Sequence, residues 1–276
     1  MGRTSLLLSV PAAALSVIWV GIVSAAMVAS GVGPVPPPQT YQIVVVAGQS
    51  NAVGHGPIIP EWEIDATGIF QLGRHGTTNL AILPAVEPLA HWEAGGTGFA
   101  LEAVSLMRSA DPRDYLIIPA ALGGTGFVDN MWNPGDPLYR DLVQRVRYVL
   151  HAYPGSTVRA VLWHQGESEW VEADDGYNDA FPLQLQTMIA ALIAEAGMPE
   201  NVPFLVGGLA PEFEATVSPN PSEVLLAVTH RRPMTCFVPS DQLITTDGIH
   251  LDKGSLKWLG DRYFEQYQNC ISGTKL

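Results

Sequence analysis

One serine and, far along the sequence from it, an aspartate and a histidine have the types that nucleophilic catalysis uses. Ser50 lies in "VVVAGQSNAVG", where an apolar run ends in a turn, and Asp247 and His250 lie in "TTDGIHLDKGS". A serine becomes an effective nucleophile when a histidine takes its proton and a carboxylate holds that histidine. In a compact turn a carboxylate reaches the imidazole three residues further on. We therefore predict Ser50 as nucleophile, His250 as base and Asp247 as the orienting acid.

Each of these patterns alone is also typical of ordinary structure. Ser and Asn favour turns and helix caps, because their side chains bond backbone N–H groups that have no other partner. An Asp and a His three residues apart are equally common in an exposed capping turn. The catalytic interpretation therefore depends on whether the fold brings the segments together.

Acyl transfer also needs hydrogen-bond donors for the oxyanion that forms during the reaction. We predict three: the backbone N–H of Ser50, the backbone N–H of Gly124, and the side-chain amide of Gln165. Gly124 lies in "GGTGF", a motif that also occurs at Gly95–Phe99. The second copy is favoured because it follows an apolar run, whereas the first follows the polar "HWEA".

The elements that must position these residues alternate between apolar runs and helical patterns. The predicted strands are Gln42–Gly48, Tyr115–Leu122, Thr157–Gly166, Val202–Leu209 and, as a short fifth, Met234–Ser240. Helices are predicted at 98–108, 137–153, 177–196, 221–230 and 253–267. This alternation predicts an α/β fold with a central parallel sheet of about five strands, whose carboxyl ends form the ligand-binding edge.

Composition restricts the function further. The 276 residues include 14 Lys and Arg against 27 Asp and Glu, which gives a net charge of −13. Nucleic-acid binding needs clustered cations, so we expect no nucleic-acid partner. Motifs for zinc or nucleotides are missing from the sequence, and we expect no metal and no cofactor. An acidic protein of this kind suits neutral or cationic substrates.

The N-terminus has the pattern of a targeting segment. Arg3 precedes an apolar stretch at 6–28 and a group of small residues, as in a secretory signal. We predict a signal peptide at 1–30, a Pro-rich spacer at 31–39, and one catalytic domain at 40–276, with a secreted or extracytoplasmic location. The alternative is that residues 6–28 stay as a membrane anchor.

Four motifs in order along the chain, "GQSN", "GGTGF", "WHQGESE" and "DGIHL", resemble those of SGNH hydrolases. The resemblance is to the sialate O-acetylesterase-like branch and to acetylxylan esterases of carbohydrate esterase family six. It implies a three-layer, flavodoxin-like α/β/α fold and metal-free O-deacetylation of carbohydrates. It also implies the roles predicted above for Ser50, His250 and Asp247, and for Gly124 and Gln165. The third motif departs from the family pattern, because Glu169 stands where an Asp is common.

Further residues are assigned from their places beside these motifs. We predict substrate binding by Gln49, Asn51, Glu167 and Trp132, the last through stacking on a sugar ring. The two cysteines, Cys236 and Cys270, either form one disulfide in an oxidising compartment or remain two buried thiols.

The function predicted from the sequence is that of a serine esterase that removes O-acetyl groups from a carbohydrate, either an acetylated polysaccharide or a sialate-type sugar. Two alternatives remain. One is a general lipase or thioesterase on the same fold, and the other is a secreted carbohydrate-binding protein without activity.

Overall fold

The structure is a computed structural model that describes residues 40–57, 64–173 and 176–274. The predicted signal peptide at 1–30, the anchor at 6–28 and the spacer at 31–39 lie outside the described residues. Among the helices of the described part, none has the length and apolar character needed to cross a membrane.

A seven-stranded sheet forms the centre of the fold, in the order β3-β2-β4-β1-β5-β6-β7. The strands are β1 (Gln42–Gly48), β2 (Ile69–Leu72), β3 (Ile82–Pro84), β4 (Tyr115–Pro119), β5 (Thr157–His164), β6 (Phe204–Gly207) and β7 (Thr235–Val238). All neighbouring pairs are parallel except β2 and β3, which are antiparallel. The expected five strands are present, and β2 and β3 extend the sheet at one edge.

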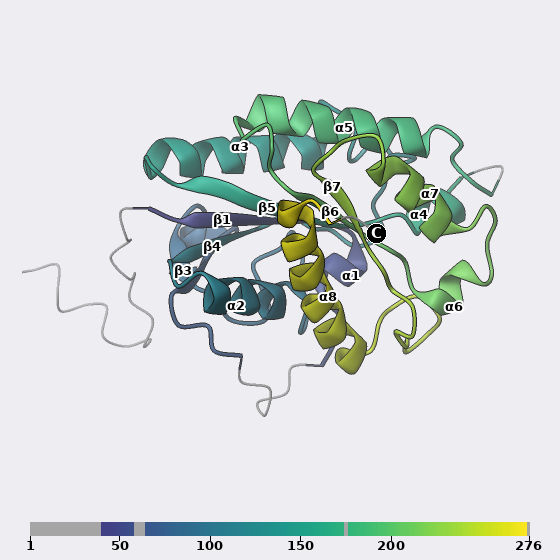
Figure 1. Ribbon diagram of the computed structural model, residues 1–276, viewed down its shortest axis with the longest axis horizontal. Helices are drawn as coiled ribbons and strands as arrows, with labels where there is room; N and C mark the ends of the chain where they lie inside the picture. The colour runs from purple at the N-terminus through teal and green to yellow at the C-terminus, as the bar shows by residue number, and fades with distance from the viewer. Residues whose placement is uncertain (1–39, 58–63, 174–175, 275–276) are drawn as a thin grey trace, which may run out of the picture. The chain divides into compact units, whose positions relative to one another are not determined.

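Helices cover both faces of the sheet and make the three layers that were predicted (Figure 1). One layer holds α3 (Pro137–Ala152), α5 (Phe181–Ala196) and α7 (Pro221–Thr229), and the other holds α2 (Ala100–Ala110) and α8 (Lys253–Ser272). Because helices cover both faces, every residue of the central β1 is buried, which explains its continuous apolar run.

Short helices follow three of the strands at their carboxyl ends. These are α1 (Ser50–Val53) after β1, α4 (Ser168–Val171) after β5, and α6 (Pro211–Glu214) after β6. A single 3₁₀ turn, η1 (Gly76–Thr78), links β2 to β3. The edge of the sheet that carries α1, α4 and α6 lies to the right in Figure 1.

Helix α8 is fixed against the end of the sheet next to α1. The ring of Tyr263 stacks on that of Phe99 with 4.4 Å between centroids, and its hydroxyl donates to the carbonyl oxygen of Trp163 at 2.7 Å. A disulfide joins Cys236 on β7 to Cys270 near the end of α8. Since α8 begins directly after the Asp247–His250 turn, the Tyr263 contacts also hold that turn near the sheet, whereas the disulfide fixes the other end of the helix.

Candidate active site

Ser50 is the first residue of α1, and its position depends on the close approach of β1 to β5 at Gly48. At Gly48 the backbone has φ +134°, and an added Cβ would lie 2.0 Å from the carbonyl oxygen of His164 on β5. Only glycine fits this approach. The next residue, Gln49, donates its backbone N–H to the same carbonyl at 3.0 Å, and Ser50 then leaves the sheet at its carboxyl edge.

Asp247 and His250 form a hydrogen-bonded turn just before α8. The Nδ1 atom of His250 lies 2.7 Å from Oδ2 of Asp247, while Oδ1 of Asp247 accepts the backbone N–H groups of Ile249 at 3.0 Å and His250 at 2.8 Å. The bond to the His250 ring is the largest of several contacts that lower the pKa of Asp247 to about 2. Asp247 is therefore ionised at neutral pH and can orient the His250 ring.

Asn51 ties this turn to the residue beside Ser50. Its Nδ2 donates to the carbonyl oxygen of Ile249, its Oδ1 accepts the N–H of Leu251, and both distances are 3.0 Å. Ile249 and Leu251 flank His250, so one side chain holds both sides of the histidine. Asn51 was predicted to bind substrate, but its side chain is buried and bonded to Ile249, Leu251 and Glu167, and that prediction is wrong.

Ser50 and His250 line one cavity of about 360 Å³. The other lining residues are Gln49, His55, Glu93, Gly123, Gly124, Glu167, Ser168, Val171, Glu172 and Ile249. Gly124 has φ +61° and open space where a Cβ would be, so its backbone is accessible to a ligand. The N–H of Gly123 already donates to Oε1 of Glu93 at 2.7 Å, which leaves Gly124 as the better donor of the two.

Gln165 is fully buried and does not line this cavity. Its Nε2 donates to Oε1 of Glu169 at 2.9 Å, an oxygen that also accepts the N–H of Phe127 at 2.7 Å. Asn178 donates to the other carboxylate oxygen of Glu169 at 2.6 Å. Glu169 therefore joins the strand end to two loops, and Gln165 belongs to this network. Its predicted oxyanion role stays a prediction.

Gln49 and Glu167 both line the cavity, and their role in binding substrate stays a prediction. The Oε1 of Gln49 lies 3.4 Å from the N–H groups of Gly166 and Ser168. Glu167 is buried, with one carboxylate oxygen bonded to Asn51 at 3.0 Å and the other without a partner among the described residues. Burial raises the pKa of Glu167 above its usual range.

Trp132 is in the core and has no surface to offer a sugar. Its side chain is 0% exposed, its Nε1 donates to Thr125 at 3.2 Å, and its ring packs edge-on against Trp163. The prediction that Trp132 stacks on substrate is therefore wrong. Trp132 is buried because its loop packs against β5, where Trp163 lies.

Sequence reasoning missed the three other titratable residues of the cavity. His55 packs its ring against that of His250, with 4.8 Å between centroids, and Glu93 and Glu172 also line the wall. His55 lies only five residues after Ser50, and this short separation could have indicated that it lies in the same site. Glu93 lies in the polar "HWEA" that was set aside when the first "GGTGF" was rejected. The described residues contain no group of three or more His, Cys, Asp or Glu suited to a metal ion.

A three-layer α/β/α fold with a serine and a histidine gathered at the carboxyl edge of its sheet defines the class of SGNH-type ester hydrolases. The model of one family, "carbohydrate esterase, sialic acid-specific acetylesterase", matches residues 40–269. The chain belongs to this family and is a carboxylic ester hydrolase.

Two curated relatives have similar sequences. A probable carbohydrate esterase of Arabidopsis thaliana is 27% identical over an alignment of 187 residues, and the match covers 60% of this chain and 67% of the relative. A probable 9-O-acetyl-N-acetylneuraminic acid deacetylase of Escherichia coli K12 is 26% identical over an alignment of 182 residues, and the match covers 50% of this chain and 56% of the relative. The similarity to the second protein thus spans little more than half of its length.

Solved structures show the same fold. The Arabidopsis thaliana protein superimposes with a TM-score of 0.71 at 22% identity, covering 84% of this chain and 99% of that one. The crystal structure of NanS gives a TM-score of 0.70 at 19% identity, covering 86% and 99% of the two chains.

Proposed function

We propose that the protein removes O-acetyl groups from carbohydrates through a Ser50–His250–Asp247 triad. The observation that carries the proposal is the Asn51 side chain, because its two bonds on either side of His250 hold that residue beside the serine. Family membership supports carbohydrate O-acetyl esters as the substrates.

In the proposed reaction His250 takes the Ser50 proton while Oγ attacks the acetyl carbon. The backbone N–H groups of Ser50 and Gly124 stabilise the oxyanion, which collapses as the sugar oxygen leaves with the proton from His250. Water, activated by the same histidine, then releases acetate and restores the serine. Ionised Asp247 stabilises the imidazolium in both steps.

The side chains of the cavity wall favour a substrate with a short acyl group over one with a long acyl group. Among the described lining residues only Val171 and Ile249 have aliphatic side chains, whereas a lipase or thioesterase needs an extended apolar groove. We therefore expect faster hydrolysis of p-nitrophenyl acetate than of p-nitrophenyl octanoate. Activity on either ester would exclude a protein that only binds carbohydrate.

Ser50→Ala tests the triad directly. Loss of a nucleophile in such a triad costs about 10⁴–10⁶ in kcat, and a second change at His250 adds little because the two residues act together. We expect acetate release by folded Ser50→Ala to fall by at least about 10⁴. A folded variant that keeps most of the wild-type rate would contradict the proposal.

We also propose export from the cytoplasm. The Cys236–Cys270 disulfide supports an oxidising compartment, as does the signal-like pattern at 1–30. Fractionation of cells that express the full chain, followed by mass spectrometry of the mature N-terminus, tests this location.

A further inference from the structure

The described wall of the Ser50 cavity carries three carboxyl groups and no permanent positive charge. Its described lining residues include Glu93, Glu167 and Glu172 but neither Lys nor Arg. The two internal segments outside the described residues, 58–63 and 174–175, also contain no Lys or Arg in the sequence. An anionic substrate would therefore meet carboxylates here without a cation to pair with.

The two histidines of the wall do not supply that cation. Burial and, after it, the neighbouring His250 lower the pKa of His55, so its ring is neutral at neutral pH. His250 must itself be neutral when it takes the proton of Ser50. Neither ring can serve as a standing partner for a substrate carboxylate.

Glu93 and Glu172 are the carboxylates placed to act on a ligand. Glu93 is held beside Ser50, because its Oε1 accepts the N–H of Gly123, whose added Cβ would lie 3.6 Å from Cβ of the serine. Glu172 follows α4 and is exposed. Glu167, by contrast, is buried and bonded to Asn51.

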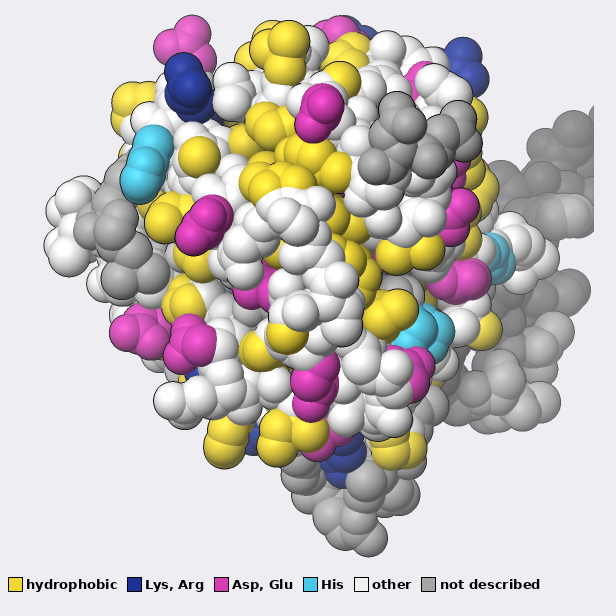
Figure 2. Space-filling model, turned by 90° about the vertical axis from the view of Figure 1, so that its right-hand side faces the viewer, with side chains coloured by type: hydrophobic (Ala, Val, Ile, Leu, Met, Phe, Trp, Pro, Cys, Tyr) yellow, Lys and Arg dark blue, Asp and Glu magenta, His cyan; other side chains and the backbone are white. Residues whose placement is uncertain are grey.

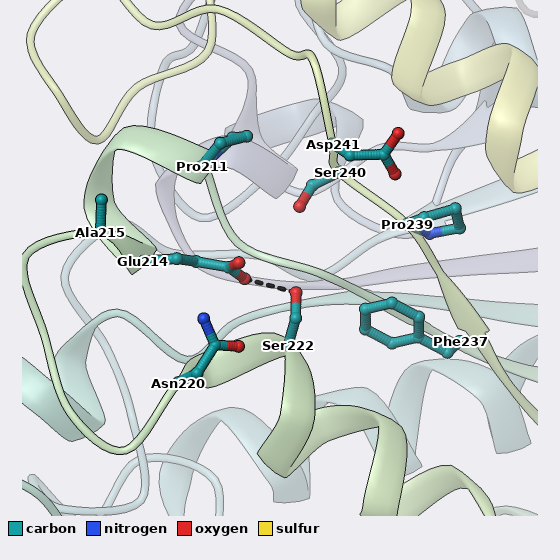
Figure 3. A pocket seen from close by; sticks show the side chains of 9 residues that line it. All are labelled: Pro211, Glu214, Ala215, Asn220, Ser222, Phe237, Pro239, Ser240 and Asp241. Carbon is teal, nitrogen blue, oxygen red and sulfur yellow. Dashed lines mark hydrogen bonds between the residues drawn. The ribbon is translucent and has the colours of Figure 1, made fainter.

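The neighbouring surface has the same character. A second hollow of about 420 Å³ lies beyond α6, lined by Glu214, Asp241 and the ring of Phe237, and its described lining also contains no Lys or Arg (Figure 3). Glu212, next to the lining residue Pro211, accepts the N–H of Thr245 at 3.1 Å, two residues before Asp247. Figure 2 shows this face of the molecule, with acidic side chains across it and basic ones near its outline.

We propose that Glu93 and Glu172 give the esterase a preference for acetyl esters of neutral sugars over those of acidic sugars such as sialic acids. This inference rests on the proposed function and adds the charge of the substrate to it. Recognition of a carboxylate normally uses Arg or Lys. A sugar carboxylate here meets like charges instead, and like-charge juxtaposition disfavours binding.

The test compares substrates that differ only in charge: 9-O-acetyl-N-acetylneuraminic acid with its methyl ester, and an acetylated methyl glucuronoside with its methyl ester. Acetate release is measured for each. We expect kcat/KM to be higher for the neutral member of each pair by at least about fivefold, the effect of one like charge at about 4 Å in water. Added salt should raise the rate on the acid alone, because salt screens repulsion.

The double variant Glu93→Gln/Glu172→Gln removes both charges and leaves an amide oxygen that can accept from Gly123. We expect the ratio between neutral and acidic substrate to fall by about fivefold or more. Glu265→Gln is the matched control, since Glu265 is exposed on α8 about 18 Å along the helix from its first turn, and its ratio should equal that of the wild type.

Three results would overturn the inference: a wild type that prefers the acids, a double variant with an unchanged ratio, or no acetate from any of the four sugars while p-nitrophenyl acetate is hydrolysed. Failure of the proposed function looks different, because Ser50→Ala would then retain activity on p-nitrophenyl acetate.

Discussion

At the scale of single residues, Asn51 is the side chain on which the geometry of the site depends. Asn51→Ala leaves the carbonyl oxygen of Ile249 and the N–H of Leu251 without their partner. The histidine between them then loses its fixed distance from Ser50, and a displacement of about 1 Å costs about 10²-fold in rate. We expect kcat to fall by roughly that factor with little change in KM, measured on p-nitrophenyl acetate.

A matched control for that variant is Asn133→Ala. The side chain of Asn133 also bridges two loop segments, by donating to the carbonyl oxygen of Phe127 and to Asp136, but it does not line the cavity. We expect the Asn133→Ala protein to have a lower free energy of unfolding than the wild type and an unchanged kcat. An Asn51→Ala protein that is folded and within about threefold of the wild-type kcat would remove the positioning role.

Gln165→Ala distinguishes between two roles for one amide. Burial and the bond to Glu169 lead us to expect a structural effect, a loss of about 1–3 kcal/mol in the free energy of unfolding, with kcat of the folded fraction little changed. Urea unfolding and kinetics on the same preparation measure both. A fall in kcat of about 10²–10³ at constant stability and KM would instead restore the predicted oxyanion role.

The residue types of the site were predictable, and the directions of their side chains were not. Ser50, Asp247 and His250 stand in turns whose chemistry is visible in the sequence. Asn51 and Trp132 were assigned to substrate because they are polar or aromatic near a strand end. Whether such a side chain faces the cavity or the core depends on loop packing, which local sequence does not encode.

At the scale of elements, the long strands and helices follow from local pattern, and the edge of the sheet does not. The continuous apolar runs at β1 and β5 and the helical spacing at α3 led to nearly the observed bounds. β2 and β3 contain four and three residues, and β3 ends in Pro84. Strands this short leave too few positions for an alternating or continuous apolar pattern.

Glu87 connects the loop after β3 to the residues just before α2, and its ionisation should make the free energy of unfolding depend on pH. Its carboxylate accepts the N–H of Leu89 at 3.2 Å in the loop after β3, and that of Gly98 at 3.3 Å just before α2. Burial raises the pKa of Glu87 to about 7. A raised pKa means that the folded state holds a proton that the unfolded state has already lost, so this contribution is present at low pH and is lost as pH rises.

We therefore expect the free energy of unfolding to decrease between about pH 4.5 and about pH 7 by up to about 3 kcal/mol through this group. Urea unfolding at several pH values measures the slope. Glu87→Gln should flatten it relative to the wild type, while Glu265→Gln should not. Parallel curves for wild type and Glu87→Gln would contradict the assignment.

At the scale of the whole molecule, one covalent link supports the C-terminal part of the fold. The Cys236–Cys270 disulfide closes a loop with a sequence separation of 34. A loop of that length stabilises a fold by about 4 kcal/mol on the chain-entropy model. We expect Cys236→Ala/Cys270→Ala to lose stability of that order in chemical denaturation.

The same double variant should keep its activity at 25 °C. The side chain of Asp252, next to the His250 turn, caps the beginning of α8 by accepting the N–H of Ser255 at 2.7 Å, and Tyr263 fixes the middle of the helix. Two free thiols per unfolded, unreduced wild-type chain would show that the bond does not form. An unchanged denaturation midpoint would show that it does not stabilise.

The Asn51 contact has a consequence for how the protein comes into being. The side chain at position 51 meets backbone atoms of Ile249 and Leu251, 198 and 200 residues later. A ribosome must therefore add residues 249 and 251 before Asn51 can make these two bonds. If the proposed triad acts, hydrolysis of esters appears only after this contact has formed, and its first appearance reports that step of folding.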